Sequence, residues 1–290
     1  MAASEADVVR GARRPADGAV PPAPSSGPAP LRAALASEWV KLRSIPHPHV
    51  YGIAAVLLGA GWAAAGSLVN RDGFLTAAAE RGDAMVLGPM IWLGVTRFTI
   101  VVAIMLGATL LTSERESGTA VVTRIVLPHS GAVYGAKLAW SAVAGLVIGA
   151  VAGIAVPLAV WIVLGPAATG FTVAPALLLG YGLRVAIVTA LCAVAGVALG
   201  ALTRSLLITA ALAFAWVWFE NLIASMLGEF ANLFVLTPWR NLSYFIDGSG
   251  YGLPYLWDSA WGFAPLAVLT LVLVLAGGLR HRADTHTTQE

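Results

Sequence analysis

Few residues in this chain have side chains whose type and spacing could do chemistry on a substrate. The best candidate for a phosphate-binding loop is the string Gly131-Ala-Val-Tyr-Gly135-Ala-Lys137. Its lysine does not directly follow a glycine, and no hydroxyl residue comes after the lysine. A phosphate loop needs that Gly-Lys-Ser/Thr end, so the string does not predict a nucleotide site.

Metal and nucleophile chemistry have equally little support. The histidines and the single cysteine, Cys192, show no HExxH, CxxC or GxSxG spacing. His47 and His49 lie two residues apart on a proline-rich turn, where a solvated turn is a simpler interpretation than a metal site. The sequence therefore predicts a chain that is not an enzyme and that binds no metal or cofactor itself.

Composition places the chain in the membrane. Hydrophobic residues make up 58% of its 290 residues and charged residues 11%, with a mean hydropathy of +0.81. A soluble domain carries about 25% charged residues. One cysteine excludes an internal disulfide, and a net charge of +2 is too small to suggest a nucleic-acid partner. We expect an all-α polytopic membrane protein in the lipid bilayer.

Apolar stretches long enough for a bilayer core, about 20 residues each, predict the transmembrane helices. The 46 residues from Leu138 to Leu183 carry no charge and are divided by Gly165–Pro166, which indicates a hairpin of two spans. We predict six spans in all, at about 50–69, 86–111, 138–164, 177–202, 206–227 and 259–279. They form one domain, 31–280, between a proline-rich disordered tail, 1–30, and a short tail, 281–290.

The basic residues predict the orientation. With both termini in the cytoplasm, nine arginines and lysines near the membrane lie inside, and three (Arg71, Arg81 and Arg240) lie outside. Positive charge in short loops stays on the cytoplasmic side, so this excess predicts a plasma-membrane protein with both termini cytoplasmic. The nine inner residues are Arg32, Lys41, Arg43, Arg115, Arg124, Lys137, Arg204, Arg280 and Arg282.

Residues 31–43 predict an amphipathic helix in the membrane interface. Leu31, Leu35, Trp39 and Leu42 recur at steps of four, four and three residues, which places them on one face. Basic side chains beside that face can reach lipid headgroups. The alternative is a helix packed on a soluble partner. Its candidate functional residues are Glu38, Trp39, Lys41 and Arg43.

A polar segment, 112–137, separates the second and third predicted spans. Gly118–Thr119 and Pro128 bracket a short apolar stretch, AVVTRIVL, that predicts one or two helical turns. Its aliphatic side chains would be poorly placed in water and favour docking to the membrane or to another protein. The candidate residues in this segment are Glu114, Glu116, Gly118, Thr119, Arg124 and Leu127.

The order of these motifs resembles a known family. The string SEWxKLRS (37–44) precedes the spans, SExxxGT (113–119) follows the second span, and Pro128 and Lys137 lead into the third. This pattern resembles the permease subunit of type-two ABC exporters, in the branch of actinobacterial drug and peptide exporters. The resemblance implies that residues 114–127 are a coupling element that docks on a separate ATPase subunit, with a contribution from the helix 31–43. Where the family often has an arginine three residues after the proline, this chain has Gly131.

Charges inside the predicted spans form a second candidate site. Arg97, Arg184 and Glu220 are costly in lipid and mark either a substrate path or a structural ion pair of Glu220 with one of the arginines. Glycines at four-residue spacing on the third and fourth spans predict close helix packing within the bundle, with a dimer seam as the alternative. They are Gly145, Gly149, Gly153, Gly196 and Gly200.

The aromatic-rich segment 228–258 precedes the last span. Aromatic residues gather at membrane interfaces, so we expect short outer helices there that act as an exit lid or only as an anchor. Its candidate residues are Trp239, Arg240 and Tyr244.

These observations predict the membrane subunit of an ATP-driven exporter. It would form the substrate pathway as a homodimer or with a related permease, and ATP would bind on the partner ATPase. A secondary transporter is the first alternative, although such proteins usually place coupling carboxylates near the midplane and only Glu220 is available. A non-transporting membrane scaffold is the second. Nothing in the sequence identifies the substrate.

Overall fold

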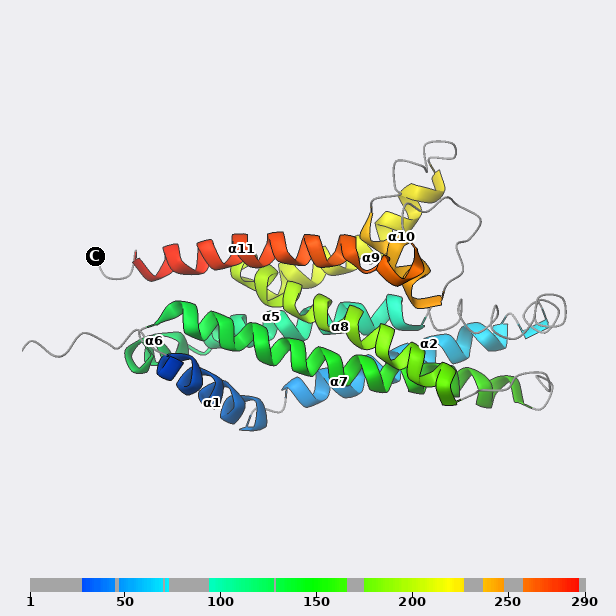
Figure 1. The fold of residues 1–290 in the computed structure, drawn as a ribbon, viewed down its shortest axis with the longest axis horizontal. Helices are drawn as coiled ribbons and strands as arrows, with labels where there is room; N and C mark the ends of the chain where they lie inside the picture. Colours follow the sequence, from blue (N-terminus) through cyan, green and yellow to red (C-terminus); the bar gives the residue numbers. More distant parts are fainter. Residues whose placement is uncertain are drawn as a thin grey trace, which may run out of the picture.

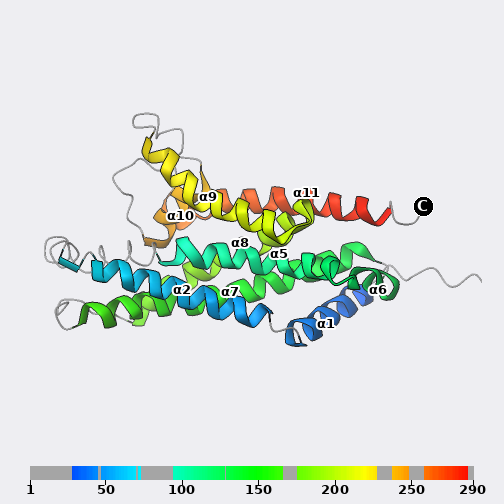
Figure 2. The same ribbon diagram turned by 180° about the vertical axis from the view of Figure 1, so that it is seen from behind.

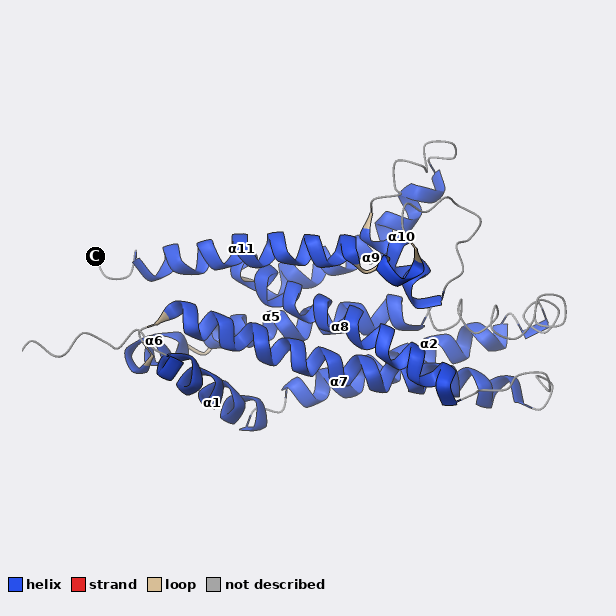
Figure 3. Ribbon diagram, in the orientation of Figure 1, coloured by secondary structure: helices blue, strands red, loops and turns tan. Residues whose placement is uncertain are grey.

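The structure, a computed structural model, describes residues 28–44, 47–69, 71–72, 94–127, 129–165, 175–226, 237–247 and 258–286. This part of the chain is all-helical and contains no strand (Figure 3). The predicted disordered tail, 1–30, and most of the aromatic-rich outer segment lie outside the described residues, as do the first residues of the predicted second span.

Long helices run side by side along the molecule, with short ones at its two ends (Figure 1). The elements in chain order are α1 (Pro28–Ser44), α2 (His47–Val69), the π-helix η3 (Val95–Thr99), α5 (Ile100–Glu116), α6 (Thr119–Val126), α7 (Ser130–Leu164), α8 (Pro175–Thr203), α9 (Leu206–Met226), α10 (Pro238–Asp247), the 3-10 helix η6 (Ser259–Trp261) and α11 (Ala264–His286).

Four stretches of helix are long and apolar enough to cross a membrane: His49–Val69, Ser130–Leu164, Leu178–Thr203 and Ser259–Asp284. Leu206–Glu220 is a shorter apolar helix. Large apolar side chains face outward on these helices; Leu57 is 66% exposed and Ile162 69%. An outer surface of this kind suits lipid, which confirms the prediction of a helical membrane protein, while four rather than six spans meet the length criterion.

Helix α8 lies at the centre of the bundle and packs against α5, α7 and α11. Glycines allow the closest of these approaches. A Cβ added at Gly145 would lie 2.7 Å from the Cα of Ala190, and one at Gly149 would lie 2.6 Å from the Cα of Ala186. The glycine spacing therefore serves packing within the bundle, as predicted.

Helix boundaries differ from the predicted spans where polar residues are accommodated inside a helix. Residues 112–116, expected at a helix break, continue α5, and the hydroxyl of Thr112 donates to the Ala108 carbonyl at 3.1 Å. The break comes at Gly118, whose φ of 71° ends the helix. Helix α7 begins at Ser130, eight residues before the predicted span. The expected tight turn after the fourth span is confirmed at Arg204, φ 59°.

Both described ends of the chain lie at one end of the molecule. Helices α1 and α6 and the C-terminal part of α11 lie together there, whereas α10 lies at the opposite end (Figures 1 and 2). Helix α10 is the described part of the expected outer helical segment, and its Leu242 and Ile246 are fully buried against the bundle.

Candidate functional site

The N-terminal helix α1 is fixed against the start of α7. The Trp39 ring stacks on the Trp140 ring, with centroids 4.7 Å apart and an interplanar angle of 22°. The Trp140 indole N–H donates to the Leu35 carbonyl at 3.0 Å. Stacked aromatic pairs of this geometry stabilise by about 0.5–1.5 kcal/mol beyond their buried area. The predicted apolar face of α1 therefore packs partly on protein through Trp39.

Two lysines and two glutamates meet beneath α1, and we call this group the four-charge cluster: Glu38 and Lys41 on α1, Glu114 on α5 and Lys137 on α7. Lys137 Nζ lies 3.0 Å from Glu38 Oε2 and 2.9 Å from Glu114 Oε1. Lys41 Nζ lies 2.9 Å from Glu38 Oε1 and 2.5 Å from Glu114 Oε1. Each lysine therefore bridges both carboxylates, and three helices are joined by charge.

The cluster is buried and its hydrogen bonds are well satisfied. The side chain of Lys137 is 1% exposed and that of Glu38 is 4% exposed. Lys137 Nζ also donates to the Leu110 carbonyl at 2.7 Å, and Lys41 Nζ lies 3.4 Å from the Thr123 hydroxyl of α6. A buried charge without such partners would cost several kcal/mol, so the four groups depend on one another.

The environment of the cluster favours its charged form. Burial opposes ionisation of Glu114, but the charge of Lys137 and the hydrogen bonds from Lys137 and Lys41 outweigh it and lower the pKa of Glu114. Burial likewise opposes the charge on Lys41, and its hydrogen bonds to Glu114 and Glu38 outweigh that effect and raise the pKa of Lys41. Both groups therefore stay ionised through the neutral range.

Helix α6 carries an apolar face that nothing in the described part of the chain covers. Val121, Val122, Ile125 and Val126 are between 60% and 77% exposed. The helix follows directly from α5 through the left-handed Gly118, and the Ser117 hydroxyl caps the last turn by donating to the Ser113 carbonyl at 2.7 Å. The prediction of one or two helical turns here is confirmed, and the orientation of α6 is tied to that of α5.

The other predicted residues of this loop lie around α6. Glu116, Gly118 and Thr119 are exposed, and Leu127 is half-buried at the end of the helix. The side chain of Arg124 lies outside the described residues. On α1, Arg43 is exposed and its guanidinium lies 5.6 Å from the centre of the Trp39 ring. The structure thus brings Glu38, Lys41 and Glu114 together and leaves Glu116, Gly118 and Thr119 at the surface.

A second ion-pair group lies at the same end of the molecule and was not predicted. Asp284 of α11 accepts from Arg115 of α5 at 3.0 Å and also from Arg204 in the α8–α9 turn. Arg280 lies one helical turn before it, with Nε 3.9 Å from Asp284 Oδ1. The sequence signal was available, since Asp284 follows a basic run, but pairing across 169 positions has no local pattern.

The intramembrane charges do not meet as one group among the residues that the structure describes. Arg184 of α8 donates to the Ile246 carbonyl at the end of α10, at 3.5 Å, and lies over the Phe245 ring at 6.0 Å. Glu220 accepts from the Trp216 indole N–H at 2.6 Å within α9. Arg97 lies in the π-helix η3, and its side chain is outside the described part. The considered ion pair between Arg184 and Glu220 is absent from the described contacts.

The outer residues are placed only in part. Tyr244 is half-buried on α10, whereas the side chains of Trp239 and Arg240 lie outside the described residues. No group of histidine, cysteine, aspartate and glutamate that could hold a metal occurs in the described ranges.

Lys137 is the functional residue whose role sequence reasoning missed. It was noted only as part of the motif order, yet it forms the centre of the four-charge cluster. The signal was a single lysine at the start of a long uncharged run, which requires a buried carboxylate partner.

Comparison of the chain with protein-family models, with curated proteins and with solved structures found no match.

Proposed function

We propose that this chain is the membrane subunit of an ATP-driven exporter of the plasma membrane, with six spans, both termini cytoplasmic and a second permease copy or a related chain beside it. A separate ATPase subunit would dock on α6 and α1. The resemblance of the motif order supplies the family, and the arrangement of α6 supports the docking role. Exposed apolar patches of this kind mark interaction surfaces.

One observation carries the proposal: the four-charge cluster connects the proposed docking element to the bundle. Glu114 lies on the helix that leads into α6, and its carboxylate is held by Lys41 of α1 and Lys137 of α7. Thr123 of α6 approaches the same lysine, Lys41. A push on α6 by a closing ATPase would therefore act on α1, α5 and α7 together rather than on a loose loop.

The docking role can be tested at Ile125, which is 77% exposed. The chain is co-expressed with an ATPase subunit encoded beside its gene, and the complex is purified through a tag on the ATPase. We expect Ile125→Asp to remove the permease from the complex and Ile125→Leu to retain it, because a hot-spot apolar contact is worth about 2 kcal/mol or more. Stimulation of ATP hydrolysis in liposomes is measured on the same samples. An intact complex with Ile125→Asp would show that α6 is not the docking element.

A further inference from the structure

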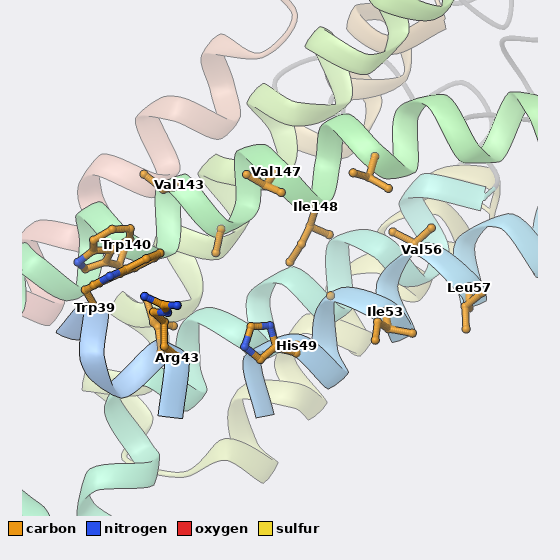
Figure 4. A pocket seen from close by; sticks show the side chains of 14 residues that line it. Trp39, Arg43, His49, Ile53, Val56, Leu57, Trp140, Val143, Val147 and Ile148 are labelled. Carbon is orange, nitrogen blue, oxygen red and sulfur yellow. The ribbon is translucent and has the colours of Figure 1, made fainter. Parts of the chain in front are cut away.

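A groove on the outer surface of the bundle has the chemistry of an amphiphile site. It has a volume of about 610 Å³ and lies between α1, α2 and α7 (Figure 4). Its walls are almost entirely apolar, with Ile53 and Leu57 on α2 facing Val147 and Val151 on α7. These side chains are 50–66% exposed, so the groove opens outward toward the surroundings of the bundle.

Polarity is confined to one end of this groove. Arg43 and His49 lie there beside the Trp39–Trp140 stack, whereas Ile53, Val56 and Leu57 extend away from them (Figure 4). Both polar side chains are exposed. Within the described part of the chain Arg43 has no carboxylate partner, and its contact is with the face of Trp39. A positive, unpaired guanidinium at the end of an apolar channel fits an anionic headgroup.

The length of the groove matches one leaflet. Its α7 wall extends from Trp140 to Val151, which at 1.5 Å per residue is about 16 Å. One leaflet of the hydrocarbon core is about 15 Å thick, half of about 30 Å. The indole rings lie at the polar end, where aromatic residues occupy the headgroup level of a membrane.

We propose that this groove binds an anionic phospholipid, with the phosphate at Arg43 and His49 and an acyl chain along α2 and α7. Arginine forms bidentate charge-assisted hydrogen bonds with phosphate oxygens, which a zwitterionic headgroup offers with less net attraction. Gly52 leaves the groove floor without a side chain. The inference does not depend on the exporter function, because it uses only the chemistry and dimensions of the groove.

The test uses the full chain in nanodiscs made from equal amounts of phosphatidylglycerol and phosphatidylcholine, with retained lipid counted by native mass spectrometry. We expect the unmodified protein to retain phosphatidylglycerol preferentially. Arg43→Gln should lower that preference by about fivefold, the effect of one basic residue near an anionic surface. Val147→Trp should fill the channel and reduce retention of both lipids.

Matched controls separate the site from general lipid effects. Arg32→Gln removes an exposed positive charge from the same helix α1, and Val272→Trp adds the same bulk to an exposed position of α11; both residues lie outside the groove. We expect both to retain lipid as the unmodified protein does. Val151→Trp replaces Val147→Trp if the latter melts at a lower temperature.

Three results would overturn the site. One is an unmodified protein that retains no lipid, and another is equal retention by the groove variants and the controls. The third is disulfide formation between two Ile53→Cys copies with no lipid retained, which would show that a second copy fills the groove.

Discussion

Lys137 on α7 donates to Glu38 on α1 at 3.0 Å, across 99 positions of sequence, and both side chains are almost fully buried. This contact fixes a helix at the membrane surface to the first turns of a long apolar helix. Because the same ammonium group also contacts Glu114, the orientation of α1 and the end of α5 depend on one lysine. The first predictions concern that dependence.

Removal of Lys137 should destabilise the protein severely. Lys137→Met leaves Glu38 and Glu114 with Lys41 as their common partner, so one buried negative charge is uncompensated. Breaking a buried ion pair in this way costs about 3–5 kcal/mol. We expect a large fall in the melting temperature of the detergent-purified protein, and faster proteolysis of α1.

A double variant shows whether charge balance is the reason. Lys137→Met combined with Glu38→Gln leaves Lys41 and Glu114 as a neutral pair, so it should recover part of the lost stability. Arg32→Met, an exposed change on the same helix, should shift stability by less than about 0.5 kcal/mol. Strictly additive effects of Lys137→Met and Glu38→Gln would contradict a shared cluster.

The cluster also predicts a loss of stability in acid. The pKa of Glu114 is lowered from its ordinary value of 4.5 because Lys137 and Lys41 outweigh its burial. A lowered carboxyl pKa contributes stability above the unfolded value, and that contribution disappears as pH falls through the folded pKa. We expect the melting temperature to fall below pH 4.5, and Glu114→Gln to weaken this dependence.

Glu116→Gln is the matched control for the acid experiment, because Glu116 lies two residues away and is exposed. It should keep the pH dependence of the unmodified protein. The raised pKa of Lys41 acts at the other limit, where its contribution is present below 10.5 and disappears as pH rises through the folded value. An acid transition unchanged by Glu114→Gln would show that other carboxylates cause it.

Helical class and helix hairpins were predictable because they depend on local quantities. An uncharged run of 46 residues divided by Gly165–Pro166 specifies two helices whatever surrounds them, and α7 and α8 follow. The start of α7 was predicted too late because a lysine reads as a polar boundary. Lys137 is instead inside the helix, neutralised by carboxylates that come from other helices.

The site was predictable residue by residue but not as an arrangement. Glu38, Lys41 and Glu114 stood in the expected motifs, yet spacing along one helix cannot show that Glu114 lies 73 positions from a partner on α1. Asp284 illustrates the same limit, since its partners Arg115 and Arg204 come from two distant turns. Long-range ion pairs depend on tertiary packing, which local periodicity does not specify.

The close approach of α7 and α8 predicts a sharp size limit at Gly149. Gly149→Ala would place its Cβ 2.6 Å from the Cα of Ala186, so the two helix backbones would have to separate. Overpacking of this kind costs about 1–3 kcal/mol. Gly180→Ala is the control, because nothing lies within 4 Å of its added Cβ. We expect a lower melting temperature for the first variant only, and equal values would refute the close packing.

Asp284 should hold the end of α11 against α5 and the α8–α9 turn. Asp284→Asn removes the charge that Arg115 and Arg204 share, and a hydrogen bond to a charged group contributes about 1.5–3 kcal/mol. We expect hydrogen exchange in 278–286 to become roughly tenfold faster, as local opening becomes easier. The exposed Asp258→Asn should leave this exchange unchanged, and a similar increase there would indicate a general effect of lost charge.

Glu220 separates a structural role from a substrate path. Its Oε2 accepts from the Trp216 indole at 2.6 Å, one turn earlier on α9, and a neutral amide accepts this bond less strongly than a carboxylate. If the role is structural, Glu220→Gln should lower the melting temperature while export by the reconstituted complex stays normal. Trp216→Phe removes the donor and keeps a ring, so it should lower the melting temperature similarly, and the double variant should add little. A loss of export at unchanged melting temperature would place Glu220 in the path instead, because only a group that contacts the moving substrate affects transport without affecting the fold.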